Sequence, residues 1–273
     1  MAISNQDGLV SALAGVVPQN RAMWTKANVT SVAGRMCSLW TGTGQPGTGS
    51  LTLGQAAAGA VSTSADTGAY PFTNPSGQNT YAGRAIASSA ATGMLVLFDL
   101  LWVWGSGGSG WVVTTTTAQA TTSPAALTRP DANGNGTELW LEVLSTLGAG
   151  ASTPSISYTN SGGTGSRTTS ALASTSGFIT GSMVQFPLQA GDTGVKSVQS
   201  MTLTTTMTSG TARVCILRRV AEIPITTANV PVLLDFAALG LPQIYDSASL
   251  FWAFLPVSTT SGPVSIKLDL IQG

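Results

Sequence analysis

The pattern of hydrophobic and polar positions along the chain is that of short β-strands separated by turns. β-Branched and aromatic residues gather in short runs, and clusters of Gly, Pro, Asn and Ser lie between them. Because these runs follow one another without intervening helical periodicity, we expect antiparallel sheets packed as a β-sandwich or jelly roll. The strands are predicted at 31–40, 82–88, 94–103, 111–117, 138–144, 155–159, 181–186, 197–207, 212–218, 249–255 and 264–271.

Two of these runs are apolar at nearly every position. The run 95–103 is interrupted only by Asp99, and the run 250–255 is not interrupted at all. A strand with one solvated face would alternate, as 264–271 does. We therefore expect both faces of the first two strands to be covered by a loop, a second sheet or a neighbouring subunit.

A helix is predicted only at the start of the chain. Ser4, Asn5 or Asp7 can cap a short helical turn, which Gly15 ends and Pro18 prevents from continuing. The expected helix is short and carries little charge.

The domain organisation follows from these elements. Residues 1–20 are expected to form an N-terminal helical arm, and residues 21–273 a β-sandwich domain. A chain of 273 residues can bury a sizeable core as one large β domain or as two smaller ones. A division of the sandwich into two β subdomains is left open.

Charge and composition narrow the classes of function. Charged residues make up 8% of the chain, against about 25% in an average soluble domain, and 11 basic residues balance 11 acidic ones. A hydrophobic fraction of 43% is enough to drive folding. Nothing here attracts nucleic acid or an anionic membrane, so neither is expected as a partner. Because a neutral protein has little electrostatic protection against self-association, we expect contacts with other subunits.

The composition provides few of the residue types that catalysis commonly uses. The chain has no histidine, which removes the commonest general base and metal ligand. Glu138 and Glu142 share one face of a predicted strand, but they lie about 13 Å apart in an extended chain, too far for a glycosidase pair. We interpret them as solvent-facing residues beside a turn. The expectation is a protein with no enzymatic activity and no cofactor.

A glycine pattern resembles the dinucleotide-binding fingerprint. Gly105, Gly107 and Gly110 satisfy G-x-G-x-x-G after an apolar strand. That motif must open a helix whose N-terminus holds the pyrophosphate, whereas a β sequence follows here. We interpret the segment as a hairpin loop.

A second pattern matches the spacing of a calcium-binding loop. Asp131, Asn133, Asn135, Gly136 and Glu142 reproduce the EF-hand spacing. The flanking helices are missing, because prolines precede the loop and a strand is predicted after it. A Ca²⁺ ion held by Asp131, Asn133 and Asn135 is the one candidate metal site, beside the simpler interpretation of an Asn-Gly turn.

The cysteines and the N-terminal residues lead us to expect a protein made in a cytoplasm. Cys37 and Cys215 are expected as buried free thiols, although a disulfide between them is left open. The first residues carry no basic region and no long apolar run, so no secretory signal is expected. The longest apolar stretch, 94–104, is shorter than the roughly 20 residues that a membrane helix needs.

Several framework segments carry a resemblance to known proteins. They are 4–9 (SNQDGL), 24–26 (WTK), 33–35 (AGR), 101–102 (LW), 138–142 (ELWLE) and 234–242 (LDFAALGLP). In these segments, which spread over nearly the whole chain, the protein resembles a group of tailed-bacteriophage virion structural proteins. The resemblance implies a place in a virion, made in the cytoplasm of the bacterial host, and not a reaction.

Within a virion, the composition suits a capsid decoration (cement) protein. Such a protein would contact itself and other virion proteins, such as the major capsid protein. A homo-oligomer is expected, with the trimer preferred because β-rich cement proteins of phage heads are often trimers.

Two other interpretations are left open. A tail- or fibre-associated adhesin would share the β-rich texture, with the loops around Trp104, Trp111 and Tyr158 as a surface for host glycans. A secreted enzyme such as a polysaccharide lyase is the third interpretation, and the missing histidines weigh against it.

Overall fold

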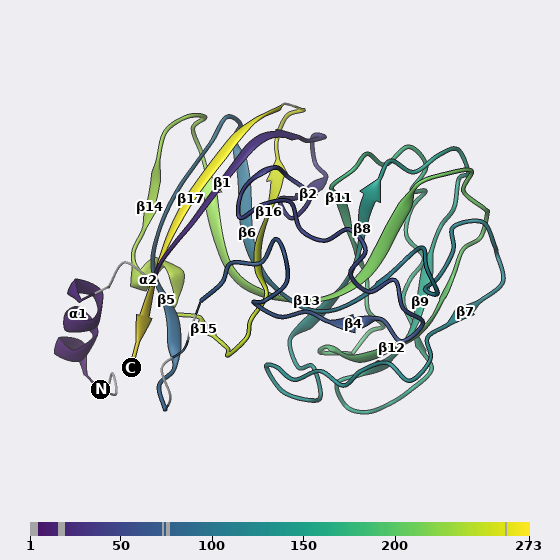
Figure 1. Cartoon of the computed structure of the whole chain (residues 1–273), viewed down its shortest axis with the longest axis horizontal. Helices are drawn as coiled ribbons and strands as arrows, with labels where there is room; N and C mark the ends of the chain where they lie inside the picture. Colours follow the sequence, from purple (N-terminus) through teal and green to yellow (C-terminus); the bar gives the residue numbers. More distant parts are fainter. Residues whose placement is uncertain (1–4, 16–19, 73, 75–76, 260) are drawn as a thin grey trace. The chain divides into compact units, whose positions relative to one another are not determined.

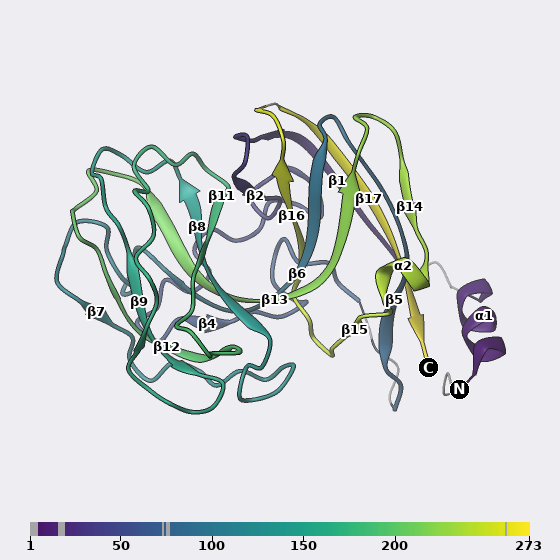
Figure 2. The same cartoon turned by 180° about the vertical axis from the view of Figure 1, so that it is seen from behind.

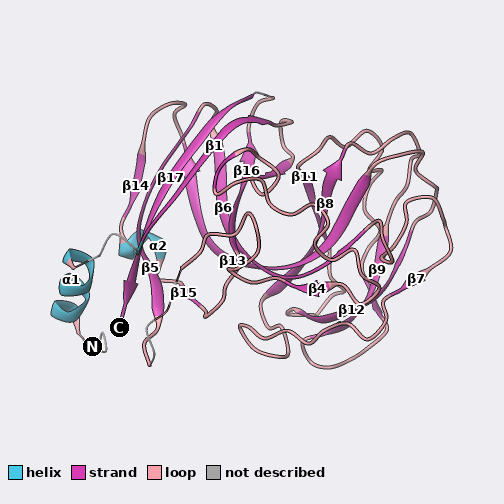
Figure 3. Cartoon of the chain, in the orientation of Figure 1, coloured by secondary structure: helices cyan, strands magenta, loops and turns pink. Residues whose placement is uncertain are grey.

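The part of the chain that the structure describes is all-β, with two short helices (Figure 3). The computed structural model describes residues 5–15, 20–72, 74, 77–259 and 261–273. Paired strands run antiparallel, which confirms the predicted fold class. In chain order the elements are α1 (Gln6–Ala14), β1 (Arg21–Thr30), β2 (Met36–Ser38), β3 (Gly44–Gln45), β4 (Ala60–Val61), β5 (Thr80–Ser89), β6 (Gly93–Gly105), β7 (Gln119–Ala120), β8 (Thr137–Ser145), β9 (Ser155–Asn160), β10 (Arg167–Thr168), β11 (Ser182–Phe186), β12 (Val195–Thr202), β13 (Thr211–Ile225), β14 (Val232–Leu234), α2 (Phe236–Leu239), β15 (Gln243–Ile244), β16 (Leu250–Pro256) and β17 (Ser261–Gln272).

The chain forms two compact units. Unit 1 comprises Met1–Gly49, Ser64–Phe98 and Val220–Gly273, and unit 2 comprises Ser50–Thr63 and Asp99–Arg219. Two of the four boundaries fall within β6 and β13, and the other two fall in the segments on either side of β4.

Unit 1 contains a sheet in the order β14-β5-β17-β1-β3, with β15 also paired to β5. Figures 1 and 2 show β14, β5, β17 and β1 side by side from both directions. A second set of strands consists of β2, β16, the first half of β6 and the end of β13. Apolar residues of both sets form one core, so that unit 1 is a β-sandwich.

The core of unit 1 combines tryptophans with small residues. Trp24 of β1 and Trp252 of β16 meet edge to face, with ring centroids 6.0 Å apart. Alanines at the inward positions of β5, such as Ala85 and Ala87, leave room for these rings. The predicted alternation of 264–271 is confirmed for Val264, Ile266, Leu268 and Leu270, which belong to this core, whereas Ile271, expected on the wetter face, is also buried.

Helix α1 lies over one end of the first sheet of unit 1. Asn5 caps it by accepting a hydrogen bond from Gly8 N (2.8 Å), as predicted, and Gly15 ends it. A Cβ atom at Gly83 would lie 2.9 Å from Leu13 Cδ2, so the absence of a side chain there lets the helix approach the sheet. No residue of α1 is buried. Ser4 and Pro18, the other predicted cap and stop, lie outside the described residues.

Unit 2 contains a sheet in the order β10-β9-β12-β7. Its other strands are β8, β11, β4, the second half of β6 and the first part of β13. The core residues include Leu139, Leu141, Val143, Val214 and Ile216 from the second set, and Ile156, Tyr158, Val198 and Met201 from the first. Unit 2 is thus a sandwich with its own core.

Two buried ion pairs lie within unit 2. Arg129 Nε and Nη2 donate to the Asp99 carboxylate at 2.8–3.1 Å, and Arg129 Nη2 also donates to the carbonyls of Ser62 and Leu100. Arg213 Nε donates to Glu142 Oε2 at 2.6 Å. The side chains of both pairs are at most 3% exposed. Burial of a charge is costly, so the opposite charge of its partner is needed to compensate that cost.

Three predicted strands were wrong in part or entirely. The segment 111–117 is a loop, because the Gln119 side chain bonds both the N–H and the carbonyl of Val112, where a strand partner would otherwise bond. The predicted strand 31–40 is interrupted by a turn in which Arg35 N donates to the Val32 carbonyl. The predicted strand 197–207 ends at residue 202.

Candidate functional site

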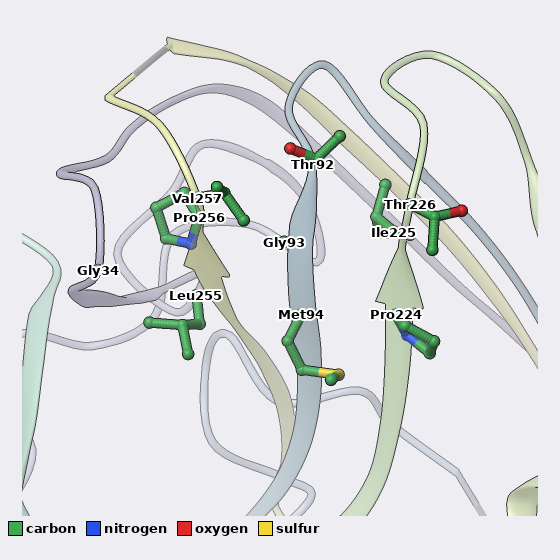
Figure 4. Close-up of a pocket in the computed structure, with 10 residues that line it drawn as sticks. All are labelled: Gly34, Thr92, Gly93, Met94, Pro224, Ile225, Thr226, Leu255, Pro256 and Val257. Carbon is green, nitrogen blue, oxygen red and sulfur yellow. The ribbon is translucent and has the colours of Figure 1, made fainter.

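An apolar groove in unit 1 is the candidate functional site. It lies at the ends of β16, β6 and β13 and has a volume of about 790 Å³. Figure 4 shows Leu255, Met94 and Pro224 side by side across these three strands. The complete lining is Gly34, Thr92, Gly93, Met94, Pro224, Ile225, Thr226, Leu255, Pro256 and Val257.

The local sequence explains why the strands end around this groove. Pro224 and Pro256 have no N–H to donate to a neighbouring strand, so they suit strand ends. A Cβ atom at Gly93 would lie 2.2 Å from the Leu255 carbonyl oxygen, so only glycine lets β6 and β16 approach there. Gly34 N donates to the Pro256 carbonyl (2.9 Å), which attaches the Gly34 turn to the groove.

The groove offers apolar contact and no ionic chemistry. None of its lining side chains carries a charge, and the hydroxyls of Thr92 and Thr226 are their only polar groups. Leu255 and Val257 are 37% and 73% exposed, although both are large and apolar. Such a surface binds by burial of apolar area.

The predicted calcium turn is closed by hydrogen bonds of its own. Asp131 Oδ1 accepts from Asn133 N (2.7 Å) and Gly134 N (2.8 Å), and Oδ2 accepts from Asn135 Nδ2 (3.1 Å). These bonds hold the pKa of Asp131 below its usual range, that from the Asn135 side chain having the largest effect. Asn135 therefore orients its amide nitrogen, which is no metal ligand, toward Asp131. Within the described ranges, no three His, Cys, Asp or Glu residues are grouped to hold a metal.

Glu142, the last position of the calcium motif, does not join this turn. We expected Glu138 and Glu142 to face solvent, and for Glu142 this is wrong, because it is fully buried against Arg213. Glu138 is partly buried and pairs with Arg219 at 3.1 Å. Arg213, which compensates the buried charge of Glu142, is 71 residues away along the chain. The local sequence pattern therefore gave no sign of it.

Cys37 and Cys215 are both buried thiols, and they form no disulfide with each other. The Cys215 thiol lies 3.8 Å from Glu142 Oε2. Burial raises the pKa of the Cys215 thiol far above its ordinary value, which keeps it protonated.

The loop with the G-x-G-x-x-G pattern is a tight turn without a following helix. Gly110 N donates to the Gly107 carbonyl (3.0 Å), and Gly107 N donates to the Trp111 carbonyl (3.0 Å). Trp111 then enters the core of unit 2. No helix N-terminus stands where a pyrophosphate would bind.

The aromatic residues proposed for glycan binding are buried. Trp104 and Trp111 are each 1% exposed, and Tyr158 is fully buried. Trp111 Nε1 donates to the Trp104 carbonyl (2.9 Å) inside the core. These rings are therefore not available to stack on a sugar.

A polar cluster in unit 2 fastens the loop before β12 to β9 and β10. Asp192 accepts hydrogen bonds from Tyr158 Oη (2.5 Å), Asn160 Nδ2 (2.7 Å) and Arg167 Nε (3.0 Å). The Arg167 bond, followed by those from Tyr158 and Asn160, lowers the pKa of Asp192 to about 2.

The low pKa of Asp192 predicts a loss of stability in acid. Because the folded-state pKa lies below the ordinary value of 3.8, the ionised carboxylate stabilises the fold above about pH 4 and loses this effect as the pH falls toward 2. Asp192→Asn should melt at a lower temperature than the wild type at pH 6, and the difference should shrink at pH 2. Thermal unfolding followed by circular dichroism measures it. An equal difference at both pH values would contradict the assignment.

The burial of one lysine was not predicted from the sequence. Lys26 of β1 is 1% exposed, and its Nζ donates to the carbonyls of Gly42 (3.1 Å), Pro46 (2.6 Å) and Gly47 (3.3 Å). Burial lowers the pKa of Lys26 to about 8. The lysine fastens the loop 42–47 onto the sheet, which is a structural role.

Neither helix in the described part of the chain is long and apolar enough to cross a membrane.

The comparisons with known proteins supply no family. No protein-family model and no curated protein matches the chain. Among solved structures, the VP2 subviral particle of infectious bursal disease virus is 10% identical, with a TM-score of 0.19 over 91% of this chain and 80% of that chain. A structure of the Gt strain of the same virus is 11% identical, with a TM-score of 0.14 over 93% and 82%. Similarity this low carries no argument about fold or function.

Proposed function

We propose that the protein is a non-enzymatic structural component of a bacteriophage virion, a capsid decoration protein that stabilises the shell through apolar contacts between subunits. The observation that carries this proposal is the apolar groove of unit 1, which has no charged lining residue and leaves Leu255 and Val257 exposed. The resemblance of the framework segments to virion structural proteins points to the same role.

The ion pairs formed by acidic side chains also support a structural role. Asp99, Glu142 and Asp192 each pair with an arginine of the same unit. Carboxylates held in this way stabilise the fold and are poor candidates for general acids or bases.

A second copy of the chain is the proposed occupant of the groove. The chain has no net charge, so copies do not repel one another over distance. Apolar burial contributes about 25 cal/mol per Å² and is not screened by salt, which suits a neutral groove. The trimer expected from the sequence remains part of the proposal.

Charges placed in the groove should dissociate the oligomer. The wild type at micromolar concentration should elute as an oligomer, and Leu255→Asp/Val257→Asp as a monomer of 27.6 kDa, because two carboxylates would have to be desolvated in the contact. Size-exclusion chromatography with light scattering gives the mass. Val112→Asp is the matched control, since Val112 is 42% exposed in unit 2. A monomeric wild type, or a variant of unchanged mass, would refute this use of the groove.

The position of the protein in a particle tests the function itself. Cryo-electron microscopy of the virion should show ordered copies on the outside of the head shell. Copies on the tail or its fibres would favour the adhesin, and absence from the particle would overturn the proposal.

A further inference from the structure

The outer face of the first sheet in unit 1 carries a row of four residues across four strands, with the two end residues exposed. The register places Met23 opposite Lys267, Lys267 opposite Ile86, and Ile86 opposite Leu233. Side chains directly opposite each other point to the same side of a sheet. Met23 and Leu233, at the two ends of this row, are 58% and 61% exposed.

The neighbouring row on the same face is ionic. Asp269 lies opposite Arg21 on one side and Arg84 on the other. Its carboxylate accepts from Arg84 Nε at 2.8 Å and lies 3.4 Å from Lys267 Nζ. The Asp269 side chain is 2% exposed, whereas those of Arg84 and Lys267 are 44% and 32% exposed. The anion is therefore covered, and the cations face outward.

The charge of this face differs from that of the whole chain. Strands β1, β5, β14 and β17 contain one acidic residue, Asp269, whereas Arg21, Arg84 and Lys267 lie on the outer face. The three cations and one carboxylate of these strands sum to +2, and Asp7 of helix α1, which lies over one end of this sheet, lowers the local sum to +1 on a chain with no net charge. Asp235, which follows β14, accepts the N–H groups at the start of α2. Two copies of this face would repel each other, so it does not suit symmetric self-pairing.

We infer that this outer face binds an acidic protein surface that also carries apolar side chains. Arginine and methionine are enriched in protein interfaces, and complementary charge increases both the specificity and the rate of association. The apolar groove lies elsewhere in unit 1 and shares no lining residue with this face. A nucleic acid or an anionic lipid headgroup would engage the cations but leave Met23 and Leu233 without a role. The inference does not depend on the position of the protein in a virion.

A fluorescent copolymer of glutamate and leucine is a suitable probe for this chemistry. In anisotropy titrations of the full chain, it should bind more tightly than polyglutamate, and a copolymer of lysine and leucine should not bind. Arg84→Glu/Lys267→Glu should weaken binding by about tenfold or more, because attraction becomes repulsion. Lys196→Glu, an exposed lysine of unit 2, is the matched control and should change binding little.

Two further measurements do not require the charge-reversed variant to fold. Met23→Ser/Leu233→Ser should reduce binding of the Glu-Leu copolymer to the level of polyglutamate. Raising NaCl from 50 to 500 mM should weaken binding to the wild type. No binding of the Glu-Leu copolymer, no preference over polyglutamate, an equal effect of Lys196→Glu, or tighter binding to duplex DNA or phosphatidylglycerol vesicles would overturn the inference.

Discussion

Replacing Arg129 with methionine is expected to destabilise the protein by about 3–5 kcal/mol, because it removes the Arg129 cation that pairs with the fully buried Asp99 carboxylate. Methionine fills a similar volume, so the effect reports the lost charge more than a cavity. Equilibrium unfolding in urea measures the free energy.

Two controls separate the ion pair from the loss of an arginine. Arg219→Met breaks the Arg219–Glu138 pair, whose side chains are 35% and 20% exposed, and should cost about 1 kcal/mol or less. Asp99→Leu/Arg129→Met removes both charges and should recover much of the stability. Recovery should be incomplete, because the carbonyls of Ser62 and Leu100 still lose their donor. A single variant as stable as the wild type would show that the buried carboxylate does not need its cation.

Asp99 also shows what the sequence could and could not predict. Its apolar neighbours in 95–103 correctly predicted a strand buried on both faces. The same run gave no sign of how a carboxylate could lie within it, because Arg129 is 30 residues away along the chain. Local periodicity reports which positions face the core, whereas the partner of a buried charge is fixed by tertiary structure.

Strand β1 was missed for a related reason. Its inward positions include Ala22, Trp24 and Lys26, and its outward positions include Arg21 and Met23. A lysine in the core and a methionine outside blur the alternation from which a half-buried strand is recognised. The carbonyls of the loop 42–47 accept hydrogen bonds from this lysine and so compensate its burial, and they come from outside the strand.

The candidate site was not predictable from local sequence. The groove assembles residues from the Gly34 turn and the ends of three strands that are far apart in the chain. By contrast, the turn at Asp131 was recognisable, because its hydrogen bonds join residues within four positions. Short-range turns follow from sequence, whereas a surface built from strand ends requires the fold.

Replacing Arg213 with methionine should be as damaging as the change at Arg129. Arg213 and Glu142 are both fully buried on adjacent strands, so the variant leaves Glu142 buried without a cation. We expect a loss of about 3–5 kcal/mol in the free energy of unfolding, measured in urea. Glu142→Leu/Arg213→Met is the matched control, and most of the stability should return in it because neither charge remains.

The thiol of Cys215 gives an independent measure of the same effect. In the native protein it should react slowly with a thiol reagent, because it is buried and its pKa is raised. A Cys37→Ser background leaves Cys215 as the only thiol. If reaction requires the strand pair to open, a loss of about 3 kcal/mol raises the open population, and hence the rate, by about 100-fold. The rate should fall again in the double variant. An unchanged rate in Arg213→Met would mean that the Arg213–Glu142 pair does not keep this part of unit 2 closed.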